Sequence, residues 1–161
     1  MTKEYTTTTG YDIRIRNVPH LAMELAASKI VQPEVPMYLN ESKKEWQENP
    51  NAPEYIEALQ QYEKSRERAM LDTMLSFGVL TDAKPPAKKT LIKELREMDE
   101  AVGGGLIDGY DLDSQRDLDI LWKRYYVLGA VVDLAAVQRY AVVQWEAVRD
   151  ALQSFRTSTE G

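Results

Sequence analysis

The spacing of apolar side chains changes several times along the chain, and each change predicts a different element. Residues 11–16 alternate apolar and polar positions, which predicts a short strand at the edge of a sheet. A first helix should begin near Pro19, because its fixed φ suits the first helical position, and should end before Pro33. The side chains that this helix is expected to bury are Leu21, Leu25 and Ile30.

Prolines separate this first helix from the longest one. Between Pro33 and Pro53 they remove backbone donors and favour extended geometry, so this stretch is expected to be an extended, proline-rich arm. From Pro53 to Phe77 apolar residues recur at helical spacing, which predicts one long amphipathic helix. Gly78 is placed to end that helix.

Three further helices are predicted in the second half of the chain. Periodic apolar residues outline one over residues 91–102, which a run of glycines should end. Residues 111–114 supply cap residues for the next helix, and Gly129 should terminate it. Asp133 is expected to cap the last helix, which should run to about Phe155.

The predicted fold class is therefore mainly α. We expect a single helical domain of about five helices over residues 11–161, with a short N-terminal β element and the extended proline-rich arm. Residues 1–10 should form a polar, threonine-rich arm. A chain of 161 residues is long enough to bury a core of its own. Residues 81–161 would hold the C-terminal helices.

The last predicted helix has an unusually wide apolar stripe. Tyr140, Val143 and Trp145 belong to it, and such a width exceeds that of a simple one-sided surface helix. Two interpretations remain open. The extra apolar residues are either core residues of a helical domain or a surface for a partner or a second copy.

Composition narrows the classes of function. The net charge of −6 argues against binding to a phosphate backbone, and the densest basic stretch, residues 84–93, is interrupted by two prolines. The absence of cysteine excludes disulfides and thiolate chemistry. No apolar run is long enough to span a membrane, and the N-terminus lacks a hydrophobic signal core. We expect no nucleic acid or membrane partner, and a cytoplasmic location.

Three features could suggest chemistry, and none supports an enzyme. His20 is the only histidine, so neither a triad nor a zinc site can be built around it. The glycine-rich residues 103–109 follow no apolar strand, which favours a helix connection over a phosphate loop. A cluster of acidic residues lacks the glycine and the glutamate that a calcium loop needs. The simpler interpretation is that these residues stabilise the N-terminus of the helix that follows, through the helix dipole. They are Asp108, Asp111, Asp113, Asp117 and Asp119. We expect no catalytic residue, no cofactor and no metal.

Protein binding is the class of function that remains. The arm exposes backbone groups beside adaptable apolar side chains, which suits docking along another chain, although folding back on the protein's own helices is an equal alternative. The predicted partner surface consists of Val35, Pro36, Met37, Tyr38, Tyr55, Leu59, Tyr140, Val143 and Trp145.

The order of motifs in the first half also resembles a known family. Five motifs follow one another along the chain. They are Val18-Pro-His-Leu21, Gln32-Pro-Glu-Val-Pro-Met-Tyr38, the stretch from Glu48 to Leu59 with its Asn-Pro and Ala-Pro pairs, Arg68-Ala-Met70 and Phe77-Gly-Val79. Over about residues 11–80 this order resembles the tail assembly chaperones of long-tailed, siphovirus-like bacteriophages.

That resemblance implies a small, mostly helical, non-enzymatic protein in the host cell cytoplasm. It would bind the long helical tape measure protein during tail assembly, with the tail tube as a further possible partner, and would form a homo-oligomer. The alternative is a permanent virion protein, such as a head-tail connector or tail terminator subunit, whose extended arms interlock neighbouring copies.

Overall fold

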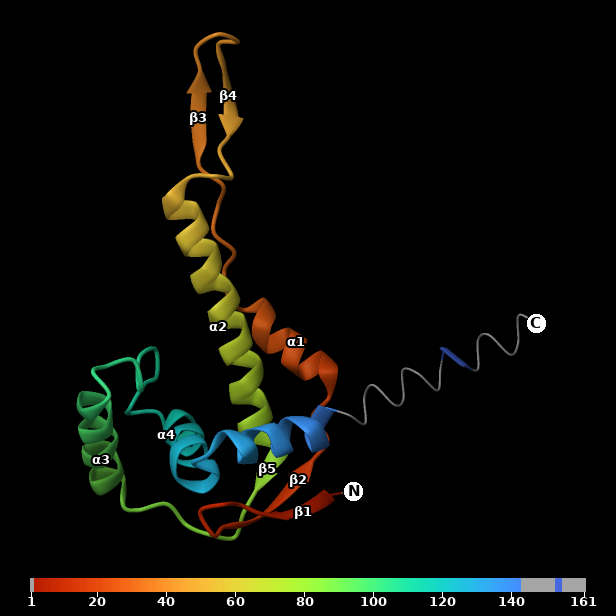
Figure 1. The fold of residues 1–161 in the computed structure, drawn as a ribbon, viewed down its shortest axis with the longest axis vertical. Coiled ribbons are helices and arrows are strands. Elements are labelled where there is room, and N and C mark those ends of the chain that lie inside the picture. The colour runs from red at the N-terminus through yellow and green to blue at the C-terminus, as the bar shows by residue number, and fades with distance from the viewer. Residues whose placement is uncertain (1, 143–152, 155–161) are drawn as a thin grey trace. The chain divides into compact units, whose positions relative to one another are not determined.

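The computed structural model describes residues 2–142 and 153–154. The described chain is mostly α-helical with short β elements. Its contacts group the residues into two units, one made of residues 1–20 and 72–161 and the other of residues 21–71. The long helix α2 (Pro53–Gly78) contributes residues to each unit. Figure 1 labels the elements.

The first unit contains a three-stranded antiparallel sheet. Its strands are β1 (Thr2–Thr6), β2 (Asp12–Arg16) and β5 (Val79–Leu80), in the order β1-β2-β5 (Figure 1). The predicted strand over residues 11–16 is confirmed, but its expected place at an edge is wrong. β2 is the central strand, and its alternation buries Ile13 and Ile15 while Asp12 and Arg14 face solvent.

The threonine-rich N-terminal segment, expected to be a polar arm, contains the strand β1. β1 pairs with β2 from Thr2 opposite Arg16 to Thr6 opposite Asp12. Threonine suits the pleated surface, and in the following turn the Thr9 hydroxyl donates to the carbonyl of Val127 at 2.6 Å. These partners attach residues 2–9 to the rest of the first unit.

The sequence placed the ends of α2 correctly. At its C-terminus, Gly78 leads directly into β5, and a Cβ at this position would lie 2.9 Å from Val18 Cγ2. The side-chain amine of buried Lys123 donates to the carbonyls of Leu75 and Ser76 at 3.3 and 3.4 Å. Cationic groups are favourable at the carbonyl end of a helix, where the last acceptors lack helical donors.

Within the described residues up to 142, the first unit contains four further helical segments. They are α3 (Lys88–Ala101), α4 (Gln115–Trp122), the π-helical turn η1 (Lys123–Leu128) and the helical residues 131–142. α4 is buried around its circumference through Leu118, Ile120, Leu121 and Trp122. The predicted cap is confirmed, because Ser114 Oγ accepts from the Asp117 amide at 3.3 Å. Gly129 ends η1 at φ 60°, where a Cβ would lie 2.7 Å from Thr9 Cγ2.

Asp133 has a different role from the predicted cap. It lies inside the helical residues 131–142 and is fully buried. Its carboxylate accepts from the Tyr5 hydroxyl at 2.9 Å, from the Thr8 amide at 3.0 Å and from the Thr8 hydroxyl at 2.6 Å. A buried carboxylate needs such donors, and these come from β1 and the turn after it. The hydrogen bond to Asp133 raises the pKa of the Tyr5 hydroxyl.

The second unit holds α1 (His20–Ser28, apart from His20), β3 (Met37–Asn40), β4 (Glu45–Glu48) and the first part of α2 (Figure 1). In this part of α2 the Arg66 guanidinium lies 5.6 Å from the centroid of the Tyr62 ring. The first helix exists, but two of its expected core residues are exposed. Leu21 and Leu25 are 75% and 62% exposed, whereas Met23 and Ala27 are buried. The helix therefore turns a different face inward from the one predicted.

The proline-rich segment is also shorter than expected. Residues 31–36 have no regular structure, but β3 and β4 then form an antiparallel hairpin with a four-residue turn. The Asn49 amide donates to the Pro36 carbonyl at 2.7 Å, which continues the pairing by one residue. The extended arm predicted between Pro33 and Pro53 is therefore wrong for most of this stretch, which forms a hairpin.

Replacing Lys123 by methionine should destabilise the first unit. The variant keeps most of the apolar stem but leaves the two carbonyls at the end of α2 without their donor, which should lower the free energy of unfolding by about 2–4 kcal/mol. Lys89→Met is the matched control, because Lys89 is exposed on α3, and it should change the value by less than about 0.5 kcal/mol. Urea unfolding of both variants measures this; equal midpoints would contradict the role of Lys123.

Alkaline pH should destabilise the protein through Tyr126. Burial and the 2.5 Å hydrogen bond to Glu94 raise the pKa of Tyr126 above its ordinary value of 10.0. Because the folded pKa exceeds the unfolded one, the contribution is complete below pH 10 and is lost as the pH rises above it. Tyr126→Phe should therefore be less stable than the wild type at pH 8 but should lose less stability between pH 9.5 and 11. Urea unfolding across this range measures both slopes, and parallel slopes would contradict the assignment.

Candidate functional site

Exposed apolar side chains are concentrated in the second unit. Of the twelve large hydrophobic residues that are exposed in the described chain, eight belong to residues 21–71. They are Leu21, Leu25, Val31, Met37, Tyr38, Leu39, Trp46 and Ile56. The other four are Phe77, Val102, Val131 and Val132. A single exposed leucine is ordinary, but such clustering indicates an interaction surface.

The β3–β4 hairpin has one polar face. Residues directly opposite each other share a face, and Tyr38 is paired with Gln47 while Asn40 is paired with Glu45. Gln47 Oε1 accepts from the Tyr38 hydroxyl at 2.9 Å and from Asn40 Nδ2 at 3.0 Å, and its own amide donates to Glu45 at 3.1 Å. This face is internally hydrogen-bonded.

The opposite face of the hairpin is apolar and exposed. Leu39 lies opposite Trp46, and Met37 lies opposite Glu48. Met37, Leu39 and Trp46 are 51%, 49% and 65% exposed, and together they are called the hairpin face below. In the second unit the two strands pair only with each other, and Figure 1 shows the hairpin extending past the N-terminal end of α2. No other element of this unit covers the hairpin face.

The turn of the hairpin contains a strained residue. Lys44 has φ 52° and is the one residue other than glycine with a positive φ in the described chain. A side chain in this conformation costs roughly 1–2 kcal/mol, which glycine would avoid. Lys43 and Lys44 place two positive charges at the tip of the hairpin, beside Glu45. A lysine at a position that favours glycine suggests a use for its charge.

A second exposed apolar surface lies on α1. Leu21 and Leu25 are four residues apart and so share one helix face; they are called the α1 stripe below. Val31, just after the helix, is 88% exposed. Two leucines one turn apart are the kind of contact that an amphipathic helix of a partner makes.

The predicted partner surface is only partly gathered in one place. Met37 and Tyr38 are exposed on the hairpin, on opposite faces, and Tyr38 is held by Gln47. Four other predicted residues of the second unit are half-buried: Val35, Pro36, Tyr55 and Leu59. Tyr140 belongs to the first unit, where Lys3 lies 5.3 Å from its ring centroid. Val143 and Trp145 lie outside the described residues.

Sequence reasoning missed Leu39, Trp46 and the α1 stripe. The signal for the hairpin was present, because Met37–Asn40 and Glu45–Glu48 are two short segments separated by a polar, four-residue turn. The prolines on either side favour extended geometry and therefore predicted an extended arm instead. For α1, the larger apolar side chains of Leu21 and Leu25 predicted which face of the helix is buried. The observed helix instead buries the face that carries the smaller Ala27.

The structure places the three chemical candidates at a helix start, in a turn that leads into a helix and in a connection between helices. His20 begins α1. In the acidic cluster, Asp117 accepts from the Asp111 amide at 2.8 Å, and Asp119 pairs with Lys123 at 3.0 Å. Gly103 to Gly105 follow α3 with positive φ values and form the connection towards α4. Across residues 2–142 and 153–154, no group of three or more potential ligands is arranged to hold a metal ion.

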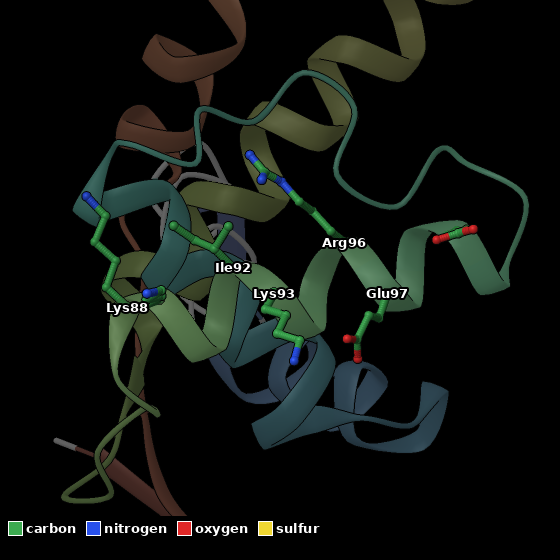
Figure 2. Close-up of a pocket in the computed structure, with 7 residues that line it drawn as sticks. Lys88, Ile92, Lys93, Arg96 and Glu97 are labelled. Carbon is green, nitrogen blue, oxygen red and sulfur yellow. The ribbon is translucent and has the colours of Figure 1, made fainter.

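A shallow hollow with a partly apolar lining lies on α3. Its lining residues all come from that one helix, so it is an open surface (Figure 2). They are Lys88, Lys89, Ile92, Lys93, Arg96, Glu97 and Glu100. In the part of the chain that the structure describes, the four cations make no ion pair. The mixture of charges gives this hollow no arrangement for catalysis.

Two further findings concern the whole described chain. None of its described helices is both long and apolar enough to cross a membrane. Comparisons of the sequence and structure with protein-family models, curated proteins and solved structures find no match.

Proposed function

We propose that this protein is a non-catalytic, protein-binding assembly chaperone, and that its client is a long helical protein. The observation that carries the proposal is the clustering of exposed apolar side chains in residues 21–71. Apolar surface that faces water is unfavourable unless a partner covers it during function. The same segment lies within residues 11–80, whose motifs resemble tail assembly chaperones of long-tailed bacteriophages.

The α1 stripe is the part of this surface best suited to a helical client. Leu21 and Leu25 offer two anchors at the spacing with which helices pack on helices. Only two such anchors on each copy make a weak contact. Weak contact suits a chaperone, because a client held at many sites by many copies can later be released from each one in turn. In this proposal the client is the tape measure protein and the location is the host cell cytoplasm.

The hairpin supports a second candidate, a permanent virion component. A β-hairpin that extends beyond the end of α2 resembles the arms by which neighbouring subunits of a ring interlock. A head-tail connector or tail terminator subunit would use it in that way. The two candidates differ in one property: a chaperone leaves before the particle is complete, whereas a ring subunit stays.

Changing the α1 stripe should abolish client binding without unfolding the protein. The double variant Leu21→Lys/Leu25→Lys adds charge at two exposed positions, so its stability should stay close to that of the wild type. We expect the wild type to keep the longest helical protein encoded beside it soluble on co-expression and to elute with it from a size-exclusion column. The double variant should lose at least about tenfold in co-eluted client, since exposed charges replace both apolar anchors.

Val102→Lys is the matched control, because it places the same charge at an exposed apolar residue of the first unit. It should bind the client as the wild type does. Mass spectrometry of finished particles completes the experiment. Absence of this chain from the particles supports the chaperone; presence in a fixed copy number contradicts it and supports the ring subunit.

A further inference from the structure

The solvent-facing side of α3 carries a cluster of cations. The helix buries Leu91 and Leu95, and the residues that line its shallow hollow lie on the side that faces water (Figure 2). Four of these lining residues are exposed cations and are called the basic strip below. They are Lys88, Lys89, Lys93 and Arg96. From the first to the last of them the helix rises by about 12 Å, at about 1.5 Å for each residue.

Three acidic residues near the basic strip are engaged with other parts of the first unit. Glu94 accepts a hydrogen bond from the Tyr126 hydroxyl. Asp99 accepts from two backbone amides of the loop that follows the helix. Asp82, which precedes the helix, pairs with Arg14 at 3.2 Å. None of these carboxylates neutralises the basic strip.

Two further carboxylates line the same hollow at its C-terminal end. Glu97 lies four residues after Lys93, and Glu100 lies four residues after Arg96, the spacing at which ion pairs form on a helix. Neither pair forms a salt bridge, and among the residues that the structure describes the basic strip has no ionic partner. The exposed side of α3 is therefore positive over its first three turns and negative at its end.

This arrangement of charges opposes the stability of the helix. Lys88 and Lys89 lie in the first turn, where the helix dipole favours anions, and no acidic residue accompanies them there. Lys89 and Lys93 are four residues apart, a spacing at which like charges repel each other. Charges that weaken their own helix indicate a contact outside it, because natural sequences break such local rules mainly at functional sites.

We propose that the basic strip binds a short acidic segment of a partner protein, in which an apolar side chain lies among the carboxylates. The carboxylates of the segment pair with the cations and offset the repulsion between Lys89 and Lys93. Half-buried Ile92 lies in the same hollow as these cations and contacts the apolar side chain. Charge complementarity thus identifies the chemistry of the partner.

Glu97 and Glu100 favour a protein segment over a nucleic acid. A nucleic acid gains affinity from each phosphate that a cation neutralises, and its charge is continuous. Beyond Arg96 such a backbone meets two carboxylates, on a chain whose net charge is −6. A protein segment can place its acidic residues over the basic strip and none beyond it. The hollow therefore suits a short acidic segment.

The inference goes beyond the proposed function and does not depend on it. The basic strip belongs to the first unit, whereas the α1 stripe belongs to the second. The test below uses synthetic peptides and no client. Its failure leaves client binding by the α1 stripe untouched, and the failure of client binding leaves the basic strip untouched.

Fluorescence anisotropy with the purified full chain at low salt tests the chemistry of the segment. The probe is a labelled peptide in which a central leucine has two glutamates on each side, and it should bind with a high-micromolar dissociation constant. Glutamine in place of all four glutamates should weaken binding at least about tenfold. Serine in place of the leucine should weaken it at least about threefold. Absence of binding, or equal binding of the glutamine peptide, would overturn the proposal.

Neutral variants locate the binding site. Lys89→Gln/Lys93→Gln should weaken binding of the glutamate peptide at least about fivefold. The variant should be no less stable than the wild type in urea, because it removes a repulsion within α3. Lys29→Gln/Lys64→Gln is the matched control, since it changes the net charge equally at two exposed residues of the second unit, and it should bind as the wild type does. Equal affinities of the two double variants would place the site elsewhere and contradict the proposal.

A 20-base-pair DNA duplex tests the choice of a protein segment. The wild type should bind the duplex more weakly than the glutamate peptide. Glu97→Lys/Glu100→Lys lengthens the basic surface, so it should raise the affinity for the duplex at least about tenfold and change that for the short peptide by less than about threefold. Tighter binding of the duplex than of the peptide by the wild type would assign the basic strip to nucleic acid and overturn the proposal.

Discussion

The first unit is organised around the C-terminal end of α2, where the helix leaves its last carbonyls without helical donors. Such groups must be satisfied if the helix end is buried. The amine of Lys123 serves the carbonyls of Leu75 and Ser76, and the Arg16 guanidinium serves Phe77. Lys123 belongs to η1 and Arg16 to β2, so one helix end fixes two elements that are far apart in sequence. Because Gly78 continues directly into β5, the same point also positions the third strand of the sheet.

The sequence predicted the elements whose signals are local. Helical spacing between Pro53 and Phe77 identified α2, and Gly78, Gly129 and Ser114 correctly marked helix ends. These residues act through backbone geometry or capping, which neighbours in sequence decide. Elements whose place depends on distant partners were predicted less well. Residues 2–6 form a strand because they pair with β2. The role of Asp133 depends on Tyr5 and Thr8, which are more than 120 residues away in the sequence.

The candidate surface was predicted least well, for a related reason. Hydrophobicity in a sequence indicates which residues favour burial, but it does not indicate whether the protein itself supplies the cover. Leu21 and Leu25 have the spacing of core residues and are nevertheless exposed, because α1 buries the smaller face of Met23 and Ala27. Leu39 and Trp46 carry a hairpin signal that the neighbouring prolines obscured. Exposure of such residues becomes visible only when the whole unit is folded.

The contrast between the two units is itself an argument about function. In the first unit the buried carboxylates of Asp72 and Asp133 accept hydrogen bonds from within the unit, from Tyr110 at 2.8 Å and from Tyr5 at 2.9 Å, and the core includes the buried residues of α4. In the second unit the apolar side chains of the hairpin face and the α1 stripe face water. A unit of this kind gains stability from whatever binds to it. If the α1 stripe holds a client as proposed, many copies bound along one long helix reinforce one another, although each contact alone is weak. Each weak contact can still be released in turn, which is the behaviour that reversible assembly requires.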